Sequence, residues 1–288
     1  MYGKPYLMSM QERPLTARRG LRNTHSTPYE GNRVFNLNAH EEGETCAMKR
    51  IDFEYYWTEQ QPVDGKIYGI KEILEDADLG GIDLVVLIAG PITNPNNCGL
   101  AEFVKDEPRL IGCCQINPLF GQAAVEELET AATQWGMPIL KLMSVACNYP
   151  IYGQAPLPVL DKARELGLLV NIHSGAYLST PAQVGLVAAR YPELPIIMEH
   201  MGYRDGLGEA IEVAKVFPNV HLGTNTVAEP LMIKRAVQEV GPERVCFASN
   251  GPGVPMDFAV ESIRRLNLGE EAEGLVLGGN LVRLLGIE

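Results

Sequence analysis

The chain has 288 residues, of which 46% are hydrophobic and 21% charged, a composition typical of a folded globular protein. Its formal net charge of −12 at pH 7 disfavours nucleic acids and anionic membrane surfaces as partners, because both attract basic proteins. No apolar run approaches the roughly 20 residues that a membrane-spanning helix needs, so we expect a cytoplasmic protein that acts on a small molecule.

The first 47 residues differ from the rest of the chain. They contain neither a periodic apolar pattern nor the hydrophobic stretch of a signal peptide. Basic and acidic residues nearly balance there, whereas acidic residues predominate in the remainder. We therefore expect residues 1–47 to form a poorly ordered extension and residues 48–288 to form one domain.

From Met48 onward, strand-like apolar runs alternate with helical stretches. The expected strands span residues 50–57, 83–90, 109–117, 138–144, 170–172, 194–198, 220–226 and 244–249. The expected helices span residues 69–77, 98–105, 121–135, 157–166, 180–191, 230–240, 256–266 and 270–285. This alternation predicts an α/β fold, a closed (β/α)₈ TIM barrel, because eight strands can all be paired and covered by helices.

Two histidines end successive apolar runs between residues 168 and 202. His173 follows the run that contains Val170 and Ile172, and His200 follows residues 194–198. In parallel α/β folds ligands bind at the carboxyl ends of the strands. We therefore take His173 and His200 as the first candidates for chemistry.

Other polar residues lie within or directly after the expected strands. Glu54 and Tyr56 are two residues apart and so share a face, Lys141 lies inside an apolar run, and Asn250 follows the last strand. A carboxylate or an ammonium in an apolar strand needs a partner or a ligand. We expect Glu54, Lys141 and Asn250 to converge with the two histidines in one pocket. The alternative is a purely structural role, in which Glu54 and Tyr56 form a hydrogen-bonded pair inside the barrel.

His221 and Cys147 are weaker candidates. His221 lies early in its strand rather than at the end, and Cys147 has no histidine near it in sequence. We interpret both as structural. The six cysteines form no C-x-x-C pair, which is typical of reduced thiols in a cytoplasmic protein.

Four segments resemble the amidohydrolase-related branch (amidohydrolase family 2) of the amidohydrolase superfamily. They are NIHSG (171–175), MEHMG (198–202), FASNGP (247–252) and GGNLVRLLGI (278–287). The branch includes aminocarboxymuconate-semialdehyde-type and resorcylate-type decarboxylases and lactonases. The resemblance runs from about Met48 to Ile287. It implies a TIM barrel that hydrolyses a lactone, ester or amide, or that removes CO₂ from a small carboxylic acid.

The resemblance also implies a set of metal ligands, in which two positions depart from the family pattern. Glu54, His173 and His200 are the expected ligands of a divalent metal such as zinc, and they match the three-ligand sets of catalytic zinc. Tyr56 stands where a histidine is expected, and Asn250 stands where an aspartate is expected. A neutral amide cannot accept a proton near pH 7.

If the chain is an enzyme, we expect His200 to act as the general acid or base or to polarise a carbonyl, and Lys141 to hold a substrate carboxylate. Asn250 fills the catalytic position of the last strand. The alternative is a barrel that has lost its chemistry, and that binds a small molecule or partners an active homologue; a homo-oligomer is also compatible. We place the enzyme first, because drift would not be expected to spare Glu54, His173 and His200 together.

Overall fold

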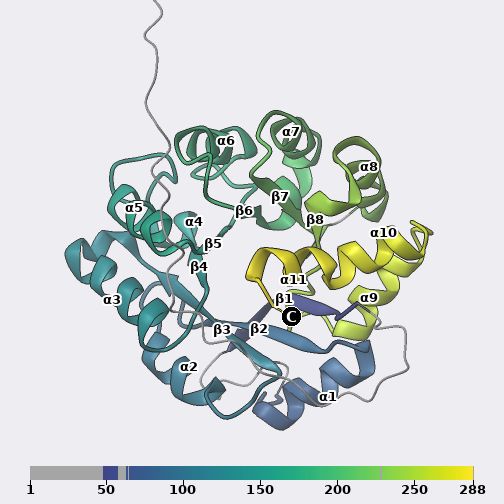
Figure 1. Cartoon of the computed structure of the whole chain (residues 1–288), viewed down its shortest axis with the longest axis horizontal. Helices are drawn as coiled ribbons and strands as arrows, with labels where there is room; N and C mark the ends of the chain where they lie inside the picture. Colours follow the sequence, from purple (N-terminus) through teal and green to yellow (C-terminus); the bar gives the residue numbers. More distant parts are fainter. Residues whose placement is uncertain (1–47, 58–62, 64, 228, 288) are drawn as a thin grey trace, which may run out of the picture. The chain divides into compact units, whose positions relative to one another are not determined.

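The computed structural model describes residues 48–57, 63, 65–227 and 229–287. Within them, eight parallel strands follow one another in the order β1 to β8 around a barrel (Figure 1). The strands are β1 (Ile51–Trp57), β2 (Leu84–Ala89), β3 (Leu110–Ile116), β4 (Ile139–Leu142), β5 (Leu169–Ile172), β6 (Ile196–Met198), β7 (Val220–Gly223) and β8 (Val245–Cys246). The predicted TIM barrel is confirmed. Residues 1–47 lie outside the described residues, so the domain boundary stays a prediction.

Most helices surround the barrel and cover the outer faces of its strands (Figure 1). They are α1 (Ile70–Gly80), α2 (Asn97–Val104), α3 (Gln122–Thr133), α4 (Ser144–Cys147), α5 (Leu157–Leu166), α6 (Pro181–Arg190), α7 (Tyr203–Val216), α8 (Pro230–Val240), α9 (Met256–Arg264), α10 (Glu270–Gly274) and α11 (Asn280–Leu285). By contrast, α11 lies across one end of the barrel, where Leu281 packs with interior side chains (Figure 1). Short 3₁₀ turns follow β3, β6 and α8: η1 (Pro118–Phe120), η2 (Glu199–Gly202) and η3 (Pro242–Arg244). The expected helix 270–285 is interrupted by a π-helical turn, η4 (Leu275–Gly279).

The barrel interior is apolar over most of its depth. Ile51 and Phe53 of β1 pack there against side chains from the other strands, including Val86, Ile139 and Ile197. A larger apolar layer lies between the strands and the surrounding helices. The interior is therefore a packed core, as in other barrels of this type, and polar side chains inside it call for a specific explanation.

The last strand closes on the first through contacts that bring two site candidates together. The amide of Phe53 donates to the carbonyl of Phe247 over 3.2 Å, and the amide of Asn250 donates to the carbonyl of Glu54 over 3.1 Å. The Asp52 carboxylate also accepts a hydrogen bond from the amide of Ser249 at 2.9 Å. Strand β8 has only two residues, so the contacts of residues 247–250 with β1 are what join the last strand to the first.

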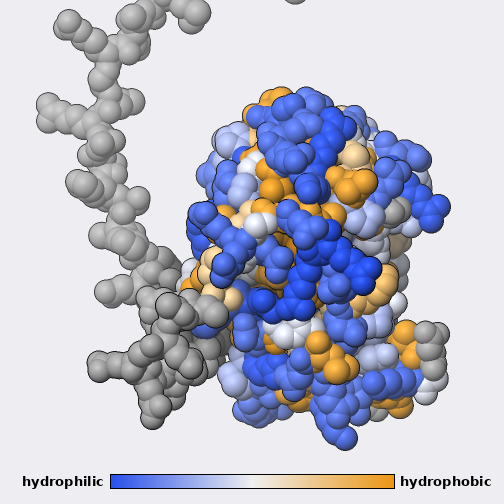
Figure 2. Space-filling model, turned by 90° about the vertical axis from the view of Figure 1, so that its right-hand side faces the viewer, coloured by the Kyte–Doolittle hydropathy of each residue, from blue (hydrophilic) through white to orange (hydrophobic). Residues whose placement is uncertain are grey.

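The outer surface on the side of α8 to α10 is mainly hydrophilic, with separate apolar patches (Figure 2). Leu231 of α8 and Phe258 of α9 are exposed large apolar side chains. Scattered exposed apolar residues of this kind are normal on a protein surface. Among the described residues, no helix combines the length and the apolar character that crossing a membrane requires.

Candidate active site

One lysine and two glutamates meet inside the barrel. Lys141 of β4, Glu54 of β1 and Glu199 of η2 are all buried. The Lys141 ammonium lies 3.2 Å from Oε2 of Glu54 and forms a closer ion pair with Oε1 of Glu199. Buried charges are tolerated when they are paired in this way. Together the three groups carry a net charge of −1 when all are ionised, which leaves a negative site.

Glu54 is held by further donors from β5 and from the segment after β7. Nδ2 of Asn171 donates to Oε2 over 3.4 Å, and Nδ2 of Asn225 donates to Oε1 over 3.0 Å. Tyr56 lies on the same strand, and its burial, followed by the nearby charge of Glu54, raises its pKa well above the ordinary value of 10.0. The Tyr56 phenol is therefore protonated at neutral pH and is a poor ligand for a metal ion.

His173 and His200 lie side by side at the ends of β5 and β6. Their ring centroids are 4.9 Å apart, with the rings edge to face. Nδ1 of His200 lies 3.1 Å from the carbonyl oxygen of Asn225 and 2.6 Å from the hydroxyl of Thr226. The Asn225 carbonyl accepts from a protonated Nδ1, whereas Nδ2 of Asn225, 3.0 Å from the same atom, donates to an unprotonated one. In the tautomer that the carbonyl favours, the lone pair of Nε2 is available to the site.

Both imidazoles are neutral at pH 7. Burial lowers the pKa of His173 to about 3 and that of His200 to about 4, and the Lys141 ammonium acts in the same direction on each. Burial also lowers the pKa of Lys141, against the opposing effect of Glu54. A neutral imidazole is the form that binds metal ions.

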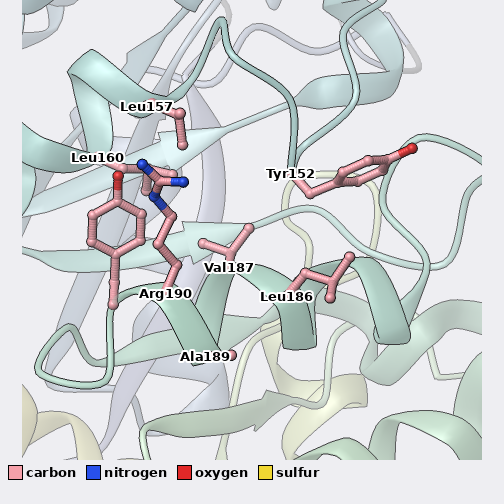
Figure 3. Close-up of a pocket in the computed structure, with 8 residues that line it drawn as sticks. Tyr152, Leu157, Leu160, Leu186, Val187, Ala189 and Arg190 are labelled. Carbon is pink, nitrogen blue, oxygen red and sulfur yellow. The ribbon is translucent and has the colours of Figure 1, made fainter. Parts of the chain in front are cut away.

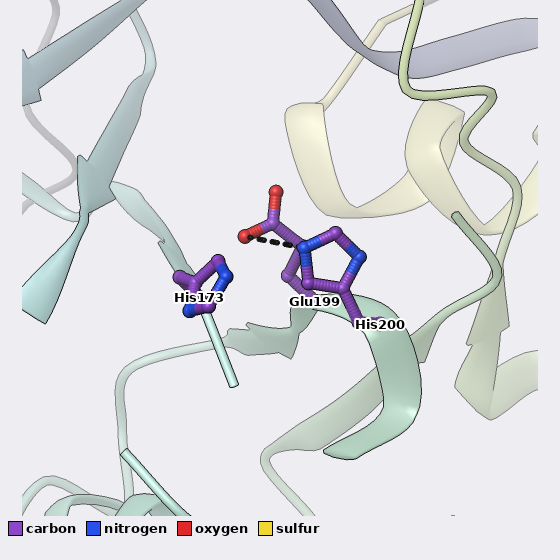
Figure 4. A group of neighbouring side chains, drawn as sticks. All are labelled: His173, Glu199 and His200. Carbon is purple, nitrogen blue, oxygen red and sulfur yellow. Dashed lines mark ion pairs between the residues drawn. The ribbon is translucent and has the colours of Figure 1, made fainter. Parts of the chain in front are cut away.

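Glu199 completes a group that could hold a metal ion. One potential ligand atom from each of His173, Glu199 and His200 lies within 4.8 Å of the others. In Figure 4 the Glu199 carboxylate and the His200 ring face one another beside His173, and Nε2 of His200 lies 3.7 Å from Oε2 of Glu199. Nδ1 of His173 and Oε2 of Glu199 are buried without a hydrogen-bond partner among the described residues. Two neutral imidazoles and a carboxylate fit a divalent ion.

Backbone strain is concentrated at this end of the barrel. Seven described residues other than glycine have a positive φ. Five of these follow β6, β7 or β8: His200, Met201, Tyr203, Thr226 and Asn250. Such conformations cost free energy and cluster at functional sites, where the surrounding structure enforces them. The strained turn of η2 places His200 beside Glu199.

The segment after β5 holds that turn in place. The Ser174 hydroxyl donates to the carbonyl of Glu199 and accepts from the amide of Gly202, the latter over 2.9 Å. Gly175 lies against the same turn with a φ of +91°. The two histidine-bearing loops therefore form one packed unit.

Gly175→Ala should destabilise this unit. An added Cβ would lie 2.3 Å from Cβ of Tyr203 and 2.5 Å from the carbonyl oxygen of Gly202, in a backbone conformation that disfavours side chains. We expect a loss of about 3 kcal/mol in the free energy of unfolding, measured by urea denaturation. Gly208→Ala is the control, because no atom lies within 4 Å of its Cβ position. Equal stability of the two variants would contradict the packing argument.

The structure brings most of the sequence candidates to one end of the barrel, with two differences. Glu54, Lys141, His173 and His200 lie there, but the group of potential ligands contains Glu199 and not Glu54. The Lys141 ammonium, expected to hold a substrate carboxylate, lies between two glutamates. The roles predicted for Lys141, His200 and Asn250 stay predictions.

Glu199 could have been found from the strand pattern. Ile197 points into the barrel with the interior cluster, and side chains alternate along a strand, so the residue two positions later faces the same way. Glu199 was not among the residues predicted for the site, although it directly precedes His200 in the MEHMG segment.

A separate hollow of about 370 Å³ lies on the outside of the barrel between α5 and α6 (Figure 3). Its lining is mostly apolar and includes Tyr152, Leu157, Leu186 and Val187. No histidine, cysteine or carboxylate lines it. It therefore lacks the groups for acid–base or metal chemistry.

His221 is buried at the other end of β7, and its neutral form sets a pH dependence of stability. Burial lowers its pKa from 6.5 to about 4, and the charges of Arg244 and Arg283 act in the same direction. The folded state thus binds fewer protons than the unfolded state between these values. Stability due to His221 is fully present above pH 6.5 and is lost as the pH falls toward 4.

His221→Asn should therefore flatten the acid limb of the stability curve. We expect the variant to lose less stability than the wild type between pH 6.5 and pH 4, by up to about 3 kcal/mol. Burial raises the pKa of Asp52 to about 7, which acts in the opposite sense, but Asp52 is present in both proteins and cancels in the difference. Parallel curves from urea unfolding across this range would show that His221 does not titrate as described.

The family model for amidohydrolases matches residues 38–287 of the chain. No curated protein matches the sequence. The fold is similar to that of 5-carboxyvanillate decarboxylase LigW from Sphingomonas paucimobilis, with a TM-score of 0.69 and 20% sequence identity over 84% of this chain and 100% of that chain.

Two further solved structures share the architecture. One is 2,6-dihydroxybenzoate decarboxylase from Rhizobium, with a TM-score of 0.60 and 15% identity over 83% of this chain and 99% of that chain. The other is dihydroxybenzoic acid decarboxylase from Polaromonas sp. JS666, which contains bound manganese and the inhibitor 2-nitroresorcinol; the TM-score is 0.65 and the identity 16%, over 83% of this chain and 97% of that chain. At these identities the likeness shows a common fold.

Proposed function

Because the chain belongs to the amidohydrolase family, we propose that it is an enzyme, a metal-dependent carboxy-lyase that releases CO₂ from a small carboxylic acid. The observation that carries the proposal is the buried charge cluster beside two neutral histidines at the carboxyl end of the barrel. Decarboxylases with the same fold, one of them with bound manganese, support the choice of reaction and of cofactor.

The charge of the site favours an anionic substrate once a divalent ion is bound. Glu54, Glu199 and Lys141 sum to −1, so a divalent ion brings the site to +1. A single substrate carboxylate would then neutralise it. In a buried site of low dielectric constant, such compensation is worth far more than in water.

Asn250 favours decarboxylation over hydrolysis, which the sequence resemblance placed first. Hydrolysis needs a base that takes a proton from the attacking water; Asn250 stands where the family has an aspartate, and an amide cannot take that proton. Decarboxylation needs no attacking water. The C–C bond to the carboxylate breaks, its electron pair stays on the carbon left behind, and a proton takes the place of CO₂.

A bound divalent ion would supply positive charge that stabilises the electrons developing on the substrate. The residues of this chain prepare the site. The Asn225 carbonyl and the Thr226 hydroxyl orient His200. Burial lowers the pKa of His173 and of His200 and so keeps both imidazoles unprotonated at pH 7. Two imidazoles and a carboxylate would suit zinc. The Polaromonas decarboxylase contains manganese, so manganese is the second candidate.

The test is a screen for CO₂ release. The metal-free protein is loaded with MnCl₂ or ZnCl₂ and incubated with aromatic and unsaturated carboxylic acids, with a lactone and ester panel run in parallel. We expect CO₂ from at least one acid and no hydrolysis. Hydrolysis alone would overturn the carboxy-lyase assignment. Thermal stabilisation by an acid without turnover would instead identify a barrel that binds a small molecule.

A further inference from the structure

The two glutamates beside Lys141 differ in what else they contact. Glu54 accepts from Lys141, Asn171 and Asn225, so both of its oxygens are engaged by protein donors. Glu199 pairs with Lys141 through Oε1, while its buried Oε2 has no hydrogen-bond partner among the described residues. That free oxygen faces the histidines (Figure 4).

We propose that a divalent ion is bound by His173, Glu199 and His200, and that Glu54 is not a ligand but the counter-ion that holds Lys141. This inference rests on the proposed function only in expecting a divalent ion. It places all three ligands on the segments that end β5 and β6. Tyr56 of β1 and Asn250, which follows β8, are neutral, so neither supplies an anionic ligand.

The contacts of Glu54 argue against ligation by that residue. To reach an ion beside the histidines, its carboxylate would have to give up hydrogen bonds from two buried amides and the ammonium. Lys141 would keep only its ion pair with Glu199, and the buried amide of Asn171 would lose its acceptor, which is costly. Glu199 needs no such rearrangement, because its Oε2 and Nδ1 of His173 are unpartnered already.

The two glutamates form a matched pair for an experiment, since both are buried and both pair with Lys141. Chelator-treated wild type, Glu199→Gln and Glu54→Gln are titrated with MnCl₂ and with ZnCl₂ in a calorimeter, and bound metal is counted by elemental analysis. We expect about one equivalent in the wild type, as for a three-ligand site. Circular dichroism and thermal unfolding establish that each variant is folded.

Glu199→Gln should weaken metal binding by more than about 100-fold. Loss of a residue that merely orients a ligand typically weakens it by about 10- to 100-fold. Glu54→Gln should keep about one equivalent, with affinity within about 10-fold of the wild type. His173→Asn should behave like Glu199→Gln and serves if the latter does not fold. The proposal is overturned if Glu54→Gln loses the metal, if Glu199→Gln keeps it, or if the wild type binds none. Since the titration needs no substrate, failure here is distinct from failure to release CO₂.

Discussion

Lys141→Met should destabilise the folded protein by about 3–5 kcal/mol, the cost typical of removing one partner from a buried ion pair. Without the ammonium, the carboxylates of Glu54 and Glu199 are left close together in the barrel interior. Like charges in a site of low dielectric constant repel strongly. The free energy of unfolding is measured by urea denaturation at pH 7, in the presence of a chelator so that no ion replaces the lost positive charge.

The control for this change is the double variant Glu54→Gln/Lys141→Met. It removes the ammonium together with one carboxylate, so only Glu199 is left without its partner. We expect the double variant to be more stable than Lys141→Met alone, since replacing both members of a buried pair is often close to neutral. If the single variant is as stable as the wild type, the ammonium of Lys141 is not the counter-charge of the cluster.

The strands could be predicted from sequence because each is a short apolar run between turn signals. The helices were predicted less completely than the strands. No helix was predicted over Tyr203–Val216, where α7 lies, because Gly206 and Gly208 weaken the helical signal that the apolar residues give. Packing supplies what propensity lacks: Leu207, Ala210, Ile211 and Ala214 of α7 are buried.

The site could be predicted in part. His173 and His200 follow apolar strands, and the carboxyl ends of parallel strands converge, so their neighbourhood was predictable. Glu54 and Lys141 were expected in the same pocket, but their ion pair and the second partner, Glu199, were not predicted. Glu54 is 87 residues away from Lys141 in sequence, and the contact exists because β1 and β4 close around the same barrel. The turn of η2, which places His200 beside Glu199, depends on positive φ at His200 and Met201, and no local sequence pattern indicates this.

His200→Ala should lower the rate of CO₂ release by about 100- to 10,000-fold, whether His200 binds the ion or transfers a proton. Its Nε2 is the ring atom that faces Glu199, 3.7 Å from Oε2. Thr226→Val should give a smaller loss, about 10- to 100-fold, because it removes the hydroxyl 2.6 Å from Nδ1 while leaving the imidazole in place.

The control for both variants is His221→Asn, which removes a buried histidine of the same barrel. Its charged neighbours are Arg244 and Arg283 rather than the cluster, so turnover should stay within about twofold of the wild type even where acid stability changes. Rates are compared at pH 7, where His200 and His221 are both neutral, and folding of each variant is checked by thermal unfolding. Equal losses in His200→Ala and His221→Asn would mean that a general loosening of the barrel lowers the rate, and His200 would then have no specific part in the reaction.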